Sequence, residues 1–191
     1  MHLLVTFGLL LASAVTGPVA PSPDPARCPE DYAVYSVVLD SLYRNVAVEA
    51  FLVGDSTRGS FPFGDRNVME AALVQESGTS AALLEDYARR NESPRPLEDC
   101  FGTRRGPVRL AGRPERERIG AASSNWDGYP DGYPAHGMVT FSRVGFTQDR
   151  TQAIVQVFFH CGGRCGGGQV VILDRPDGAW VVRRAITTYN L

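Results

Sequence analysis

A histidine and two cysteines near the carboxyl end could bind a metal or exchange disulfides. His160 is followed directly by Cys161, and Cys165 comes shortly afterwards. An imidazole and two thiolates suit zinc, but no fourth ligand is visible nearby, so we predict no metal and no other cofactor. Redox-active pairs are typically Cys-x-x-Cys at the start of a helix, and the glycines after Cys165 do not start one. A structural disulfide between Cys161 and Cys165 is the preferred interpretation.

Glycines on both sides of Arg164 could form an anion-binding nest. Successive backbone N–H groups and a guanidinium both favour negative charge. The order of residues does not match a phosphate loop, which needs a Lys and then a Ser or Thr entering a helix. We expect Gly162–Gly163 and Gly166–Gly168 mainly to make a hairpin tip flexible, with Arg164 and His160 as candidate binding residues.

A second cluster combines acidic and aromatic residues between positions 126 and 136. Its members are Trp126, Asp127, Tyr129, Asp131, Tyr133 and His136. Carboxylates and rings of this kind bind glycans or peptides, although Asp-Gly and Tyr-Pro are also ordinary turn formers. We retain the segment as a candidate binding loop for an unknown envelope or extracellular partner.

Motifs of known hydrolases are absent from the sequence. It contains no Gly-x-Ser-x-Gly, no Ser-x-x-Lys and no His-Glu-x-x-His, which are the signatures of three large hydrolase groups. Catalytic triads assemble in space and not in sequence, so this leaves open whether the chain is an enzyme. The preferred function is a non-catalytic binding domain. The alternative is a small extracytoplasmic hydrolase that uses His136 or His160 with an aspartate.

The amino terminus has the pattern of a cleavable signal peptide. Leu3–Val15 is apolar, contains Ala12-Ser13-Ala14 as a small-residue cleavage signal, and runs into a proline-rich stretch. This apolar run falls short of the ~20 residues that cross a bilayer. We predict a signal peptide over 1–20, a proline-rich linker over 21–27 and a single domain over 28–191. The protein would be secreted or periplasmic, with no integral membrane segment after cleavage.

Charge and cysteine content agree with that location. The formal net charge is -2 with scattered signs, which argues against nucleic acid as a partner. Every cationic residue is arginine, which indicates the codon bias of a GC-rich, bacterial genome. An even number of cysteines in an exported chain favours disulfides. Of three pairings, we prefer Cys161 with Cys165 and Cys28 with Cys100, because a glycine-rich connection can bring nearby cysteines within bridging distance.

Hydrophobic periodicity predicts an α+β domain. In the amino-terminal part it predicts helices over Pro29–Tyr43, Asn67–Gln75 and Thr79–Arg90, strands over Val46–Val53 and Pro107–Ala111, and a helical turn over Pro114–Ile119. The carboxyl-terminal part predicts a four-stranded antiparallel meander over Met138–Phe146, Gln152–His160, Gln169–Asp174 and Trp180–Tyr189, because apolar residues alternate and the connections are short. We expect this meander to pack against the amino-terminal helices, which would cover one of its faces. Its core would contain Tyr35, Leu39, Phe141, Phe159 and Trp180.

Several motifs are shared with a family of exported proteins. They are Tyr-Ser-Val-Val-Leu-Asp-Ser-Leu-Tyr over Tyr35–Tyr43, Phe-Ser-Arg-Val-Gly-Phe over Phe141–Phe146, Gln152-Ala153, Cys161-Gly162, Cys165-Gly166 and Gly178-Ala179-Trp180. In these motifs the chain resembles a family of uncharacterised exported bacterial proteins, many of them lipoproteins. The resemblance implies export but no particular activity. The chain departs from the family in lacking a lipid-attachment cysteine, so we expect a released protein.

Overall fold

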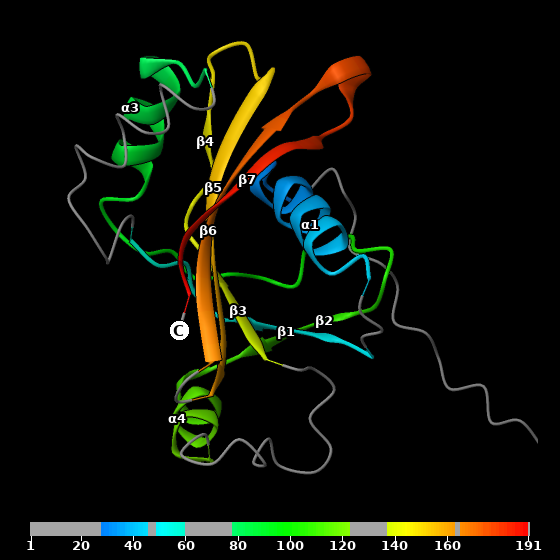
Figure 1. Cartoon of the computed structure of the whole chain (residues 1–191), viewed down its shortest axis with the longest axis vertical. Coiled ribbons are helices and arrows are strands. Elements are labelled where there is room, and N and C mark those ends of the chain that lie inside the picture. The colour runs from blue at the N-terminus through cyan, green and yellow to red at the C-terminus, as the bar shows by residue number, and fades with distance from the viewer. Residues whose placement is uncertain (1–27, 46–48, 60–77, 123–136, 163–164, 191) are drawn as a thin grey trace, which may run out of the picture.

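The computed structural model describes residues 28–45, 49–59, 78–122, 137–162 and 165–190. Within these ranges seven strands form one sheet in the order β2-β1-β3-β5-β6-β7, and β4 also pairs with β5 (Figure 1). The strands are β1 Phe51–Gly54, β2 Val108–Ala111, β3 Met138–Phe141, β4 Gly145–Phe146, β5 Gln152–Gly162, β6 Cys165–Asp174 and β7 Val181–Asn190. The helices are α1 Asp31–Leu42, α3 Ala81–Arg90 and α4 Arg113–Ala122, with a 3-10 turn, η1, at Pro176–Gly178. The predicted α+β class is confirmed.

The predicted meander is only part of this sheet. β3, β5, β6 and β7 are antiparallel neighbours as expected, but β1 and β2 extend the sheet through parallel pairing. The strand predicted over Val46–Val53 begins only at Phe51, and residues 46–48 lie outside the described ranges. All four residues of β1 are buried. This burial reflects the position of β1, which lies between two parallel partners and is covered on both faces.

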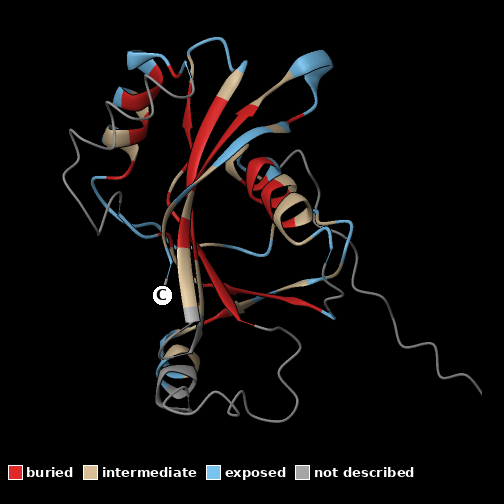
Figure 2. Cartoon of the chain, viewed as in Figure 1, coloured by how far each residue is buried: buried red, intermediate tan, exposed pale blue. Residues whose placement is uncertain are grey.

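Helices α1 and α3 pack on opposite faces of the sheet, so the prediction that helices cover one face is wrong. Ala153, Val155 and Val157 of β5 share a core with α1, whereas Ile154 packs with Leu83, Leu84 and Tyr87 of α3. Figure 1 shows the two helices on either side of the strands, and Figure 2 shows that β5 and β6 between them are largely buried, whereas β7 is more exposed. Two-sided burial explains the nearly continuous apolar run of β5.

The strand predicted over Met138–Phe146 is interrupted at Ser142–Val144. Ser142 is fully buried, and its hydroxyl accepts a hydrogen bond from the Gln156 amide at 2.8 Å. The Ser142 amide donates to the Gln156 carbonyl at 2.9 Å. From α1, the Tyr35 hydroxyl donates to the Ser142 carbonyl at 3.0 Å. The interruption is therefore attached both to β5 and to α1.

Asn91, the C-cap of α3, binds the same interruption. Its side-chain oxygen accepts from the Arg143 amide at 2.7 Å, and its side-chain nitrogen donates to the Arg143 carbonyl at 2.9 Å. The same nitrogen donates to the Tyr87 carbonyl at 2.8 Å. Gly145 allows the close approach of α3, because a Cβ there would lie 2.6 Å from the Cβ of Tyr87. Both helices are thus fixed at one point of the sheet.

Gly166–Gly168 belong to β6 and not to the flexible tip that the sequence predicted. Gly167 pairs with Phe159 and Asn190, and Gly168 pairs with Phe158 and Tyr189. A Cβ at position 168 would lie 2.5 Å from the Tyr189 ring. Glycine is needed here because a side chain packs directly over the backbone.

Two predicted helices agree closely with the structure, and a third is longer than predicted. Pro29–Tyr43 corresponds to α1, Thr79–Arg90 to α3, and the turn at Pro114–Ile119 to the longer α4. Ser80 caps the start of α3, because its hydroxyl accepts from the Leu83 amide at 3.2 Å. The helix predicted over Asn67–Gln75 lies outside the described residues. Tyr35, Leu39, Phe141 and Trp180 are buried and Phe159 is partly buried, which confirms the predicted core.

Alkaline titration should separate two buried tyrosines from the others. Desolvation raises the pKa of Tyr35 well above its ordinary value of 10.0 and also raises the pKa of Tyr87. Because the folded-state pKa is raised, this contribution to stability is complete below pH ~10 and is lost as pH rises through the folded-state pKa. We expect the phenolate absorbance of Tyr35 and Tyr87 to appear only together with unfolding, and Tyr35→Phe or Tyr87→Phe to reduce this late component. Complete ionisation with native circular dichroism would contradict the assignment.

Candidate binding groove

Most of the binding residues predicted from sequence lie outside the described ranges. Trp126, Asp127, Tyr129, Asp131, Tyr133 and His136 belong to residues 123–136, and Arg164 to residues 163–164. These assignments stay predictions. The side chains of Cys161 and Cys165 are also outside what the structure describes, so their disulfide stays a prediction, although both backbones belong to strands.

His160 is the one predicted binding residue whose side chain the structure describes. It is partly buried near the end of β5, in register with Met138 of β3 and Gly166 of β6. Among the described residues, no group of three or more histidine, cysteine or acidic side chains is arranged to hold a metal ion.

A long groove on the outer side of α1 was not predicted from the sequence. It is lined by α1, by segment 99–108, which is irregular as far as Pro107, and by Arg175 and Trp180–Val182. Its volume is about 1940 Å³. In the sequence, only the predicted pairing of Cys28 with Cys100 connected this segment with the helix.

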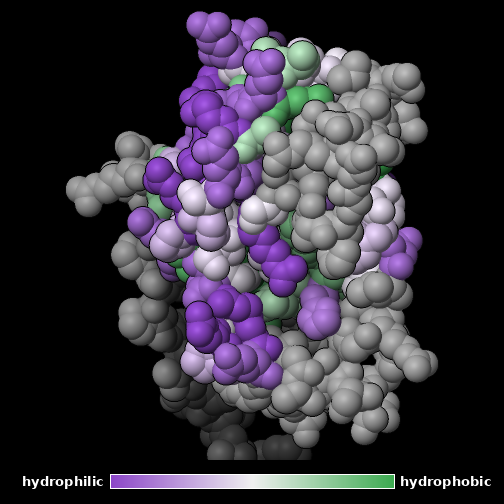
Figure 3. Space-filling model, turned by 90° about the vertical axis from the view of Figure 1, so that its left-hand side faces the viewer, coloured by the Kyte–Doolittle hydropathy of each residue, from purple (hydrophilic) through white to green (hydrophobic). Residues whose placement is uncertain are grey.

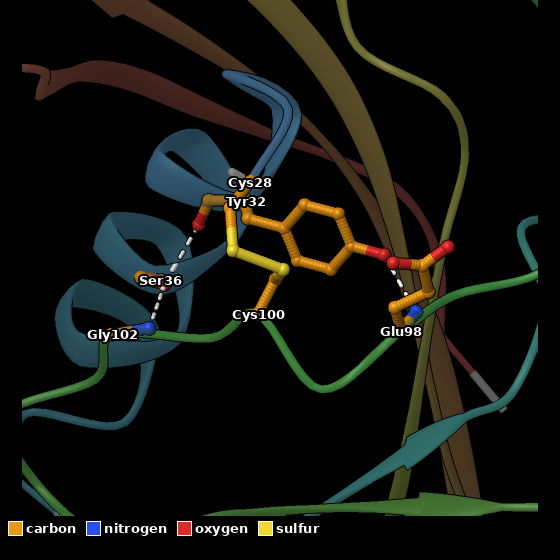
Figure 4. Close-up of a disulfide and its surroundings, with 6 residues drawn as sticks. All are labelled: Cys28, Tyr32, Ser36, Glu98, Cys100 and Gly102. Atoms are coloured by element: carbon orange, nitrogen blue, oxygen red, sulfur yellow. Dashed lines mark hydrogen bonds between the residues drawn. A yellow bond between two sulfur atoms is a disulfide. The ribbon is translucent and has the colours of Figure 1, made fainter. Parts of the chain in front are cut away.

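A disulfide fixes this segment to the start of α1. Cys28 and Cys100 are bonded, with their Cα atoms 5.7 Å apart, which confirms this half of the predicted pairing. Just before Cys100, the Glu98 amide donates to the Tyr32 hydroxyl at 2.6 Å. Figure 4 shows the disulfide and the Tyr32 ring lying together between α1 and the segment. Burial is the main cause of the raised pKa of Tyr32.

Hydrogen bonds continue this attachment along the helix. The Ser36 hydroxyl accepts from the Gly102 amide at 2.9 Å, as Figure 4 also shows, and donates to the Tyr32 carbonyl at 2.7 Å. One turn later, the Asp40 carboxylate accepts from the Arg104 amide at 3.0 and 3.1 Å. Residues four apart lie on the same face of a helix, so Ser36 and Asp40 form one row of acceptors. The irregular segment gains its order from this row and from the disulfide.

Glu30, which precedes α1, lines the groove and binds two arginines. Its carboxylate accepts from Arg175 at 2.5 Å and from Arg150 at 3.2 Å. The Arg175 guanidinium lies 5.2 Å from the centre of the Trp180 ring, and that of Arg150 lies 4.4 Å from the Phe146 ring. One carboxylate therefore fixes two hairpin turns against the start of α1.

The groove offers charge of both signs and little aromatic surface. Its lining includes the cations Arg44, Arg104, Arg105 and Arg175 and the acids Glu30, Asp40 and Asp99. Its rings are almost fully buried: Tyr32, Phe101 and Trp180 are 5, 8 and 7% exposed. No histidine is found among the described residues that line it.

Comparison with protein-family models, curated proteins and solved structures finds no match to this chain. The resemblance to a family of exported bacterial proteins therefore stays a prediction. In the part of the chain that the structure describes, no helix has both the length and the apolar character needed to cross a bilayer.

Removing the disulfide should loosen one wall of the groove. Cys28 and Cys100 are 72 positions apart, so the double variant Cys28→Ser/Cys100→Ser should lose about 4 kcal/mol of unfolding free energy on the chain-entropy model. We also expect the amides of Glu98, Gly102 and Arg104 to exchange faster with solvent, as measured by hydrogen exchange of the native state. Amides in β5 and β6 serve as the internal control. Unchanged exchange at all three positions would show that the wall does not depend on the bond.

Proposed function

We propose that this protein is a non-catalytic binding domain that acts outside the cytosol and binds its ligand in the groove between α1 and segment 99–108. The observation that carries the proposal is the size of this disulfide-fastened groove, about 1940 Å³. Small-molecule pockets typically measure about 300–1,000 Å³. A longer groove with mixed charge suits an extended ligand, such as a peptide segment or a glycan chain.

Export is supported by two independent features. The signal-peptide pattern predicts passage across a membrane. The Cys28–Cys100 bond is of a kind that persists in oxidising compartments and is rare in the cytosol. A secreted or periplasmic bacterial protein satisfies both. The loop predicted at 126–136 remains a second candidate surface for the same partner.

The hydrolase alternative has less support. His160 is in register with Met138 and Gly166 and does not line the groove, and His136 lies outside the described residues. Ser36 does line the groove, but its hydroxyl already donates to Tyr32 and accepts from Gly102. A nucleophilic serine needs its hydroxyl proton directed at a base. The hydroxyl proton of Ser36 is instead donated to the Tyr32 carbonyl.

Obstructing the groove should weaken ligand binding. Ala33 is an exposed residue of α1 that lines the groove, so Ala33→Trp should place a large side chain in it without disturbing the core. Ala82 is exposed on α3 and does not line the groove, so Ala82→Trp is the matched control. The three proteins would be screened against arrays of extended peptides and cell-envelope glycans.

We expect wild type and Ala82→Trp to bind the same ligand with equal affinity, and Ala33→Trp to bind it at least about tenfold more weakly, a loss of about 1.4 kcal/mol. Equal binding by Ala33→Trp would refute the groove as the site. Turnover of the bound ligand would instead support the hydrolase.

A further inference from the structure

Arg143 is a partly buried arginine whose charge is not matched by a bonded acid in the described structure. It lies in the interruption between β3 and β4, and its Nη1 atom donates to the Arg90 carbonyl at 3.0 Å. The nearby carboxylate of Asp31 already accepts from Arg90 at 2.7 and 3.0 Å. No ion pair joins Arg143 or Arg95 to an acid among the residues that the structure describes.

Hydrogen bonds from neighbouring segments fix the backbones of Arg143 and Arg95. Asn91 binds both the amide and the carbonyl of Arg143. The Arg95 amide donates to the Thr57 hydroxyl at 2.8 Å, and the Thr57 amide donates to the Arg95 carbonyl at 2.8 Å. The next residue, Arg58, forms an isolated bridge with Ser142. The backbones that carry Arg95 and Arg143 are therefore linked through residues 57–58.

The electrostatic environment of Arg143 is unfavourable to its own charge. Desolvation lowers the pKa of Arg143, and the positive charges of Arg90 and Arg95 lower that pKa further. Asp31 offsets this only in part. A partly desolvated charge beside like charges costs free energy unless a counter-ion is bound, and such arrangements concentrate at functional sites. Figure 3 shows the side of the molecule that carries α3, where hydrophilic residues make up much of the described surface.

We propose that Arg143 and Arg95 form a binding site for a phosphate or sulfate group. The Arg90 carbonyl holds one end of the Arg143 guanidinium, which leaves its remaining N–H donors for a ligand. A guanidinium binds two oxygens of such a group in parallel, and a second arginine adds charge and donors. Neither arginine lines the groove, so this site is separate from the one assigned to the extended ligand and does not depend on it.

The test is a titration of the folded chain with sodium phosphate and with sodium sulfate, at ionic strength held constant with sodium chloride. Backbone amide shifts report binding. We expect saturable shifts at Asn91, Arg95 and Arg143. Arg143→Gln and Arg95→Gln should each weaken the affinity about tenfold or more, since each removes charged hydrogen bonds. Arg143→Lys should also weaken it, because a lysine cannot bind two oxygens in parallel.

The control removes one positive charge from α3, away from the proposed site. Arg89 is exposed and pairs with Asp86, so Arg89→Gln should keep the wild-type affinity. Arg95→Gln keeps the test valid if Arg143→Gln does not fold, because the Arg95 side chain is exposed. Absence of saturable shifts, or equal losses in Arg89→Gln and Arg95→Gln, would overturn the site. A further arm with polyphosphate and a sulfated polysaccharide distinguishes a polymer-borne group, which would bind more tightly, from a free ion.

Discussion

Hydrogen bonds to one interruption of the sheet hold the two main helices in place. Where β3 ends, the backbone groups of Ser142 and Arg143 need hydrogen-bond partners other than a regular neighbouring strand. An unpaired buried N–H or C=O group costs about 1–3 kcal/mol. Tyr35 of α1 supplies one partner and Asn91 at the end of α3 supplies two. The helices lie on opposite faces of the sheet, and this junction is where both are bonded to the same stretch of chain.

The proposed sites follow from this arrangement. The inner side of α1 packs on the sheet, and its other side carries the acceptors Ser36 and Asp40, which order segment 99–108 into a wall of the groove. That segment has no regular secondary structure before β2 begins at Val108, so its position depends on a few hydrogen bonds and on the Cys28–Cys100 disulfide. The proposed groove therefore depends in part on a bond of a kind that persists in oxidising compartments. On the α3 side, the same junction holds Arg143 beside other arginines, where an anion would relieve the repulsion.

Local patterns in the sequence predicted α1, α3 and the four antiparallel strands, because helix and strand periodicity depends on near neighbours. Parallel pairing of Phe51 with Val108 could not be predicted in this way, since the partners are far apart in the chain. Gln156 is buried on the α3 face, and this polar residue made β5 look solvent-exposed on one side. The groove was missed for a similar reason: the hydrogen bonds that hold segment 99–108 to α1 join residues 64 and 66 positions apart. Only the cysteines gave a long-range signal, which correctly predicted Cys28 with Cys100.

Hydrogen exchange in an Asn91→Ala variant tests most directly whether the junction holds the helices to the sheet. Glu92→Ala, a change at an exposed neighbouring residue, is the control. Loss of the Asn91 bonds should cost about 2 kcal/mol of unfolding free energy. It should also accelerate exchange of the Arg143 amide and of the Phe146 amide, which α3 binds through Asp86 at 2.8 Å, while amides of β6 and β7 keep their protection. Unchanged exchange at both positions, with stability equal to that of Glu92→Ala, would contradict the account.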